Sequence, residues 1–181
     1  MLMDKRVAIL VADGFEQVEL TEPREALDAA GARTQIVSAS GGVVQGWKHY
    51  EKADRFKVDV PLDTADVEDF DALLLPGGVA NPDQLRMNPR AIAFVRSFFD
   101  AGKPVAVICH GPWTLIDAGV ARGLHLTSWP SLKADLINAG AEWTDEEVVV
   151  DGAVVSSRRP QDIPAFNRAM LGVFERGSAR S

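Results

Sequence analysis

Short apolar runs recur along the chain, and longer segments with apolar residues at helical spacing separate them. Apolar runs bounded by Gly, Pro or polar residues are typical of strands that are buried on both faces of a sheet. The predicted strands are residues 6–12, 34–38, 72–75, 105–108, 124–128, 147–150 and 154–156. The predicted helices are residues 16–30, 89–101, 112–118, 131–139 and 164–175, and a polar tail follows at 176–181.

Two features interrupt this alternation. Pro23 lies inside the first predicted helix and should kink it or split it in two. Residues 43–45 and 56–60 could be short strands of a hairpin-like excursion, with the polar segment 47–55 as its tip. Later in the chain, Asp151-Gly152 between two apolar runs predicts a tight hairpin.

Strands that alternate with helices predict an α/β fold, a mainly parallel sheet with helices on both faces. The chain of 181 residues suits a single domain over residues 1–181. Functional groups in such sheets gather at the carboxyl ends of the strands. Three strand ends carry candidate chemistry here: residues 13–16, Pro76-Gly77-Gly78 and Cys109-His110.

Cys109 directly follows the apolar run 105–108, and Pro112 then suits the first turn of a helix. A nucleophile-type residue between a strand and a helix is typical of a nucleophile elbow, a sharp turn that lifts one side chain above the sheet. The positive end of the helix should favour the thiolate and lower the pKa of the thiol. The alternative is a buried apolar thiol at a strand end.

Glu16 lies just after the first strand and could hold the thiol by a hydrogen bond and move protons for it. The alternative is an acidic residue favoured by the positive end of a helix. Glu19 and Glu22 follow at helical spacing and are expected to be solvated.

Gly77 and Gly78 leave their backbone N–H groups unobstructed, and with the N–H of His110 they could form an oxyanion hole beside Cys109. The alternative is a plain loop. Adjacent side chains on an elbow usually diverge, so His110 is not expected to pair directly with the sulfur. Asp83, in the next loop, could orient His110.

The remaining histidines favour no metal site. His49 lies in a polar segment and is expected to be an exposed bystander, whereas His125, inside a strand-like run, is expected to be structural. One cysteine and scattered histidines provide no metal-ligand spacing. The glycine pairs also lack the sequence context of a phosphate-binding loop.

Composition limits the class of protein. A net charge of -7 argues against sequence-specific nucleic-acid binding, which needs a basic surface. No apolar run is long enough to span a membrane, and the residues before the first strand lead us to expect no signal peptide. A single cysteine allows no internal disulfide, so we expect a cytoplasmic protein.

Several motifs together resemble the PfpI, or intracellular protease I, family of the class I glutamine amidotransferase-like superfamily, which includes the Parkinsonism-linked protein deglycase. They are ADGFEQVEL, LLLPGGVANPDQLR, GKPVAVICHGPWTLIDAG, INAGAEWTDEEVVVDG and VVSSRRPQDIPAFNRAM. The resemblance implies a flavodoxin-like three-layer sandwich, a homodimer or a trimer of dimers, and no cofactor.

The resemblance also implies roles for single residues. Cys109 is the expected nucleophile, Glu16 its carboxyl partner, and the N–H groups of Gly78 and His110 the oxyanion donors. An acidic residue of the neighbouring subunit orients the histidine in this family, and that position falls on Asp83.

Two further positions form the expected walls of the site. They are Gly77 and Trp129, and Trp129 stands where relatives often carry Tyr, so any role for that hydroxyl is lost.

Members of the family are described as proteases, as glutathione-independent glyoxalases, as deglycases that reverse glyoxal adducts, and as stress proteins. Thiol addition to an aldehyde needs little activation, whereas peptide cleavage must also protonate an amine leaving group. We therefore expect small carbonyls, or glycated groups on proteins or nucleotides, as substrates. The alternatives are a cysteine peptidase and a non-catalytic redox-sensing or chaperone-like stress protein that uses oxidation of Cys109. Glutamine amidotransfer is rejected, because no histidine follows His125.

Overall fold

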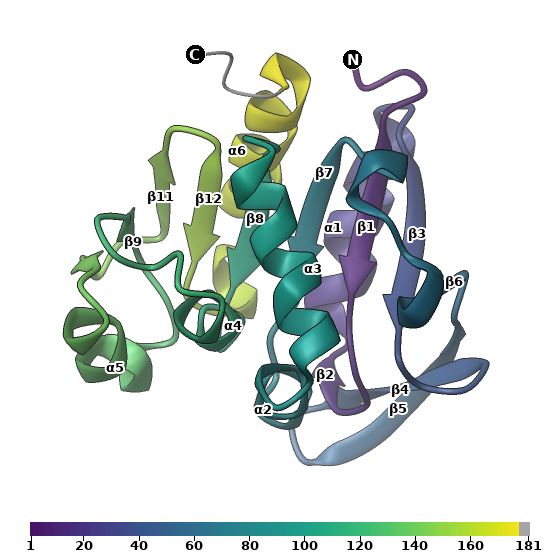
Figure 1. Ribbon diagram of the computed structural model, residues 1–181, viewed down its shortest axis with the longest axis horizontal. Coiled ribbons are helices and arrows are strands. Elements are labelled where there is room, and N and C mark those ends of the chain that lie inside the picture. Colours follow the sequence, from purple (N-terminus) through teal and green to yellow (C-terminus); the bar gives the residue numbers. More distant parts are fainter. Residues whose placement is uncertain (178–181) are drawn as a thin grey trace.

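A computed structural model describes residues 1–177 and shows a seven-stranded sheet between two layers of helices (Figure 1). Most of the predicted polar tail, residues 178–181, lies outside the described residues. The strand order across the sheet is β11-β12-β8-β7-β1-β3-β6. The bounds are β1 Arg6–Leu10, β3 Arg33–Ser38, β6 Val60–Pro61, β7 Ala72–Leu75, β8 Val105–Ile108, β11 Val148–Asp151 and β12 Val154–Ser157.

All neighbours in this sheet are parallel except β11, which pairs antiparallel with β12 across the Asp151-Gly152 turn. The strands β3-β1-β7-β8-β12 follow the flavodoxin-like order 2-1-3-4-5. The predicted α/β fold is confirmed. In this order the chain reverses direction across the sheet between β1 and β7, where such folds place their sites.

Side chains that alternate along the strands divide the core in two. Val7 and Ile9 of β1 face one layer, and Ala8 and Leu10 face the other. The first layer contains α1 (Val18–Ala29) and α6 (Ile163–Arg176). The second contains α2 (Ala80–Arg86), α3 (Pro89–Asp100), α4 (Trp113–Asp117) and α5 (Lys133–Asn138).

Smaller elements build up the edges. β2 (Phe15–Glu16), β4 (Val43–Lys48) and β5 (Glu51–Lys57) form one small sheet, and β9 (His125–Leu126) pairs with β10 (Glu142–Trp143). Four single 3₁₀ turns complete the described chain at Leu62–Thr64, Val67–Asp69, Pro130–Leu132 and Pro160–Asp162. In residues 1–177 no helix combines the length and hydrophobicity needed to cross a membrane.

The structure corrects three local predictions. The first helix begins at Val18 rather than residue 16 and runs unbroken past Pro23. Pro23 donates no hydrogen bond to the carbonyl of Glu19, and its ring is buried. Most of the predicted hairpin tip is strand, because the polar residues of β4 and β5 pair through their backbones. Helix α2 was missed, since its Asn and Pro residues resemble a turn.

Asn81, in α2, ties the ends of two central strands together. Its side chain is fully buried. Its Oδ1 accepts a hydrogen bond from the N–H of Ala12 (2.7 Å), and its Nδ2 donates to the carbonyls of Pro76 (3.1 Å) and Gly77 (3.0 Å). This amide therefore fixes the loop after β7 against the loop after β1.

We expect Asn81→Ala to lower the free energy of unfolding by about 2–4 kcal/mol, because it leaves the buried N–H of Ala12 and the carbonyl of Pro76 without partners and removes one of the two hydrogen bonds at the carbonyl of Gly77. Urea unfolding measures the change. Met87→Ala, at an exposed position just after α2, is the control and should stay within about 0.5 kcal/mol of the wild type. Equal stability of the two variants would contradict the role given to Asn81.

Candidate active site

Cys109 lies directly after β8 in left-handed backbone conformation, with φ of 64°. Its N–H donates to the carbonyl of Ser157 (3.1 Å), and its carbonyl accepts from the N–H of Trp129 (2.9 Å). A non-glycine residue in this region costs roughly 1–3 kcal/mol and is typical of functional sites. The predicted nucleophile elbow is present.

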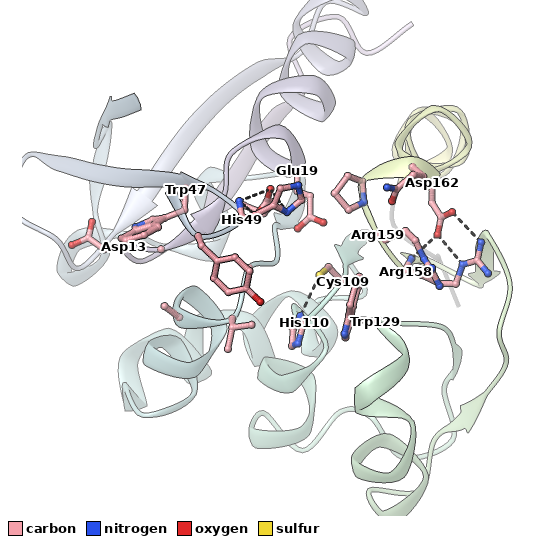
Figure 2. A pocket seen from close by; sticks show the side chains of 18 of the residues that line it. Asp13, Glu19, Trp47, His49, Cys109, His110, Trp129, Arg158, Arg159 and Asp162 are labelled. Atoms are coloured by element: carbon pink, nitrogen blue, oxygen red, sulfur yellow. Dashed lines mark hydrogen bonds and ion pairs between the residues drawn. The ribbon is translucent and has the colours of Figure 1, made fainter. Parts of the chain in front are cut away.

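The thiol lies at the floor of an open cleft of about 1070 Å³ (Figure 2). Gly78, His110 and Trp129 also line this cleft. Gly77 lies behind the thiol, where a Cβ would come within 2.6 Å of both the Cys109 Cβ and Glu19 Oε1. Only glycine lets these two side chains meet.

Glu19 is the carboxyl that contacts the thiol, and the expectation that it is solvated was wrong. Its side chain is fully buried, and Oε1 accepts a hydrogen bond from the N–H of Gly77 (3.0 Å). Its Oε2 is buried without a hydrogen-bond partner among residues 1–177, and the Cys109 thiol lies nearby. Burial, reinforced by the nearby charge of Glu16, raises the pKa of Glu19 to about 8. Glu19 is therefore mostly protonated at neutral pH and can donate a proton.

Glu16, the predicted carboxyl partner, faces another group. Both of its carboxylate oxygens accept the N–H of His49 (3.3 and 3.2 Å), and the His49 ring lies 3.7 Å away. Within residues 1–177 no hydrogen bond joins Glu16 to Cys109, although its charge contributes to raising the pKa of the thiol. Glu16 lies in β2, before the helix begins, so it does not share the buried face of α1 that carries Glu19.

His110 reaches the sulfur, contrary to the sequence expectation. Its Nδ1 lies 3.2 Å from Cys109 Sγ (Figure 2). The ring stacks on Trp129 at 5.8 Å and meets the edge of Trp113 at 5.1 Å between centroids. Burial lowers the pKa of His110 to about 4, so the imidazole is neutral near pH 7. The two tryptophan rings hold it beside the thiol.

The thiol itself is not a low-pKa thiolate. Burial, followed by the nearby Glu19, raises the pKa of Cys109 above its ordinary value. The N–H groups of Gly78 and His110 hydrogen-bond to the sulfur and act in the opposite direction, but more weakly. Helix α4 is a single short helix of 5 residues, so its dipole adds little. A proton acceptor must therefore act when the sulfur attacks.

The two N–H groups predicted as oxyanion donors thus converge on the reacting atom, and their action on a substrate oxygen stays a prediction. Trp129 lines the cleft. Asp83 is exposed on α2, and no hydrogen bond joins it to His110 within residues 1–177. Its predicted action on the histidine of a neighbouring subunit stays a prediction.

Sequence reasoning missed two other walls. Trp47, His49 and Tyr50 bring the β4–β5 hairpin to the cleft, so His49 is exposed but not remote. Arg158 and Arg159 follow β12 and line the opposite side. The sequence pattern placed residues 154–156 in a hairpin, and only the structure pairs β12 parallel with β8, so that the two arginines follow the carboxyl end of a parallel strand.

The chain matches the DJ-1/PfpI family over residues 5–172. It belongs to that family. It is 48% identical over 170 residues to the Pyrococcus horikoshii protein named deglycase PH1704, covering 94% of this chain and 99% of that protein. It is 43% identical over 173 residues to YraA of Bacillus subtilis, whose name assigns it provisionally to the cysteine proteases, covering 96% and 100%. The crystal structure of Drosophila melanogaster DJ-1beta superposes with a TM-score of 0.85 at 28% identity, covering 98% of this chain and 92% of that chain.

The raised pKa of Glu19 makes stability depend on pH. Its pKa rises from 4.5 to about 8 on folding, so between these values the folded chain binds more protons and stability falls as pH rises. His110 acts oppositely, but only between about 4 and 6.5. From pH 6.5 to 8 we therefore expect the free energy of unfolding to fall by about 1–2 kcal/mol.

Urea unfolding across this pH range measures the effect. Glu19→Gln should abolish the fall, since it removes the titrating group, while the control Glu16→Gln should keep most of it. A fall of the same size in Glu19→Gln as in the wild type would show that Glu19 is not the group responsible.

Proposed function

We propose that this chain is a cysteine-dependent enzyme of the glyoxalase or deglycase type that acts on reactive carbonyls or early glycated groups, with no cofactor. One observation carries the proposal: the Cys109 sulfur lies at the floor of a cleft with a proton acceptor, His110 Nδ1 at 3.2 Å, and a buried carboxyl, Glu19, beside it. The name of the Pyrococcus horikoshii relative, a deglycase, supports it. We also propose a cytoplasmic homo-oligomer.

The first step is addition of the thiol to an aldehyde. The S–C bond forms as the thiol proton passes to the neutral His110, and protonated Glu19 delivers a proton to the carbonyl oxygen. The product is a hemithioacetal. With an early amine adduct, the C–N bond breaks as the C–S bond forms, and the freed amine takes the thiol proton.

The next steps need no outside oxidant. Glu19, now ionised, removes the proton from the former aldehyde carbon and returns it to the neighbouring ketone carbon, while the hydroxyl proton of the hemithioacetal moves to the former ketone oxygen. The product is a 2-hydroxy thioester, and Glu19 is again ionised. Water cleaves the C–S bond and releases a 2-hydroxy acid and the thiol. The aldehyde carbon is oxidised and the ketone carbon is reduced within one molecule, so methylglyoxal and water give lactate.

Peptide hydrolysis is the second candidate. The sequence argued against it because His110 was expected to point away from the sulfur, yet its ring is in contact with Sγ. The provisional name of the Bacillus subtilis relative favours the same activity. The redox-sensing alternative gains less support, since oxidation proceeds through an accessible thiolate and Cys109 is only 6% exposed.

We expect Cys109→Ser to abolish conversion of methylglyoxal to lactate, because no other cysteine is available. Glu19→Gln should lower kcat by about 10²-fold or more, since it removes the proton-transferring carboxyl. Glu16→Gln is the matched control and should stay within about tenfold of the wild type, because Glu16 acts only through its charge. Lactate formation is measured in a buffer without Tris or thiols, which consume the dicarbonyl.

The same proteins are assayed for cleavage of a casein-derived peptide mixture. Peptide cleavage without methylglyoxal turnover would replace the proposal by the peptidase alternative. Equal activity in the wild type and Cys109→Ser would end both catalytic readings.

A further inference from the structure

Arg159 is a cation in the active-site cleft without an anionic partner. It follows β12 and lines the cleft together with Cys109 and His110. Among residues 1–177 no carboxylate lies within ion-pair distance of its guanidinium, and its Nε is buried without a hydrogen-bond partner. Its guanidinium carbon lies 5.7 Å from the centre of the Trp129 ring.

The preceding residue, Arg158, has a structural role in the same turn, because its guanidinium is paired within the protein. Arg158 donates to both carboxylate oxygens of Asp162 (2.9 and 3.0 Å) and also to Asp145 (2.9 Å). Arg158 is thereby neutralised, and Asp162 is fully occupied by it (Figure 2). The two adjacent arginines therefore differ. The guanidinium of Arg158 is paired with carboxylates of the protein, whereas that of Arg159 lines the cleft without such a partner.

The other carboxyl groups of the cleft are also engaged elsewhere. Asp13 accepts the N–H of Gln45 (2.8 Å), Glu16 accepts that of His49 and Glu19 that of Gly77. Of the four carboxyl groups in the cleft, these three therefore accept backbone N–H groups. The fourth, Asp162, is paired with Arg158. The positive charge of Arg159 is thus not cancelled by a direct contact.

Trp129 contacts both the Arg159 guanidinium and the residues of the nucleophile elbow. Its ring stacks on the His110 ring, 5.8 Å between centroids, and its backbone N–H donates to the carbonyl of Cys109. The guanidinium that lies against the same ring is therefore one aromatic side chain away from the reacting thiol (Figure 2). A substrate that places its aldehyde at the sulfur and an anionic group at Arg159 would lie along this ring, inside the one cleft that both residues line.

We propose that Arg159 is a specificity residue that binds a carboxylate on the substrate, so that the enzyme prefers 2-oxoaldehydes with a carboxylate a few carbons from the aldehyde. The inference rests on the proposed function. The planar guanidinium fork matches a carboxylate with two parallel hydrogen bonds. A single guanidinium without an ion pair in this cleft, in a chain of net charge -7, suits a singly charged carboxylate better than a doubly charged phosphate.

The test compares two substrates of equal length, 4,5-dioxopentanoate and the neutral 2-oxopentanal, by the formation of 2-hydroxyglutarate and 2-hydroxypentanoate. The wild type should show the higher kcat/KM for the acid. Arg159→Gln should lower kcat/KM for the acid about tenfold and change that for the neutral aldehyde less than about twofold. Arg159→Lys should retain part of the preference, because the charge remains.

Arg168→Gln, an equal change of charge at an exposed position of α6, is the control and should leave the preference intact. An unchanged preference in Arg159→Gln, or an equal loss for both substrates with a lower unfolding temperature, would overturn the inference in favour of a packing role against Trp129. Faster turnover of hydroxypyruvaldehyde phosphate than of 4,5-dioxopentanoate would overturn the assignment to a carboxylate.

A second measurement separates this inference from the proposed function. Cys109 is the sole cysteine, so its alkylation by anionic iodoacetate and by neutral iodoacetamide can be followed without turnover. Arg159→Gln should lower the iodoacetate-to-iodoacetamide rate ratio about fivefold, and Arg168→Gln should not. If the wild type converts no carbonyl but this ratio still falls, the proposed function fails and the anion site stands. If carbonyls are converted and the ratio is the same in all three proteins, the anion site fails alone.

Discussion

The close approach of Cys109 and Glu19 across Gly77 is the contact on which the site depends. Any side chain at Gly77 would occupy the space in which the thiol and the carboxyl meet. The N–H of the same glycine holds the carboxyl in place. Asn81 in turn binds the carbonyls of Pro76 and Gly77, so the loop after β7 has little freedom. The strained backbone of Cys109 persists because its surroundings determine it on every side.

Burial sets the chemistry of this contact. Two acidic groups share a space with little water, and burial is the largest cause that raises the pKa of each. The site therefore stores its proton at neutral pH instead of holding a free thiolate. His110, kept neutral by the same burial, lies close enough to accept that proton. The reactive form of the sulfur arises only as a substrate is attacked, which suits an electrophile that needs little activation.

Chemistry and recognition come from different parts of the chain. The ends of β7 and β8, with the first turn of α1, supply the thiol and the groups that move its proton. The β4–β5 hairpin and the turn after β12 add the outer walls of the cleft. Such a division lets the inner groups stay rigid in the core while substrate preference is decided at the rim, where side chains such as Arg159 have fewer packing constraints.

Sequence alone was sufficient for the parts of this protein that depend on local pattern. The apolar runs placed β7 and β8 at their observed residues, and Cys109 after such a run was enough to predict an elbow. The choice between Glu16 and Glu19 was beyond local pattern. Glu19 shares a buried helical face with Pro23 and Leu27, spaced four and eight residues on, but that face matters only once the helix is known to begin at Val18. The start of the helix is set by β2 pairing with β4, a contact between residues far apart in the chain. The contact of His110 with the sulfur and the unpaired charge of Arg159 likewise belong to the tertiary structure, because burial, strain and the presence or absence of a partner are properties of neighbours in space.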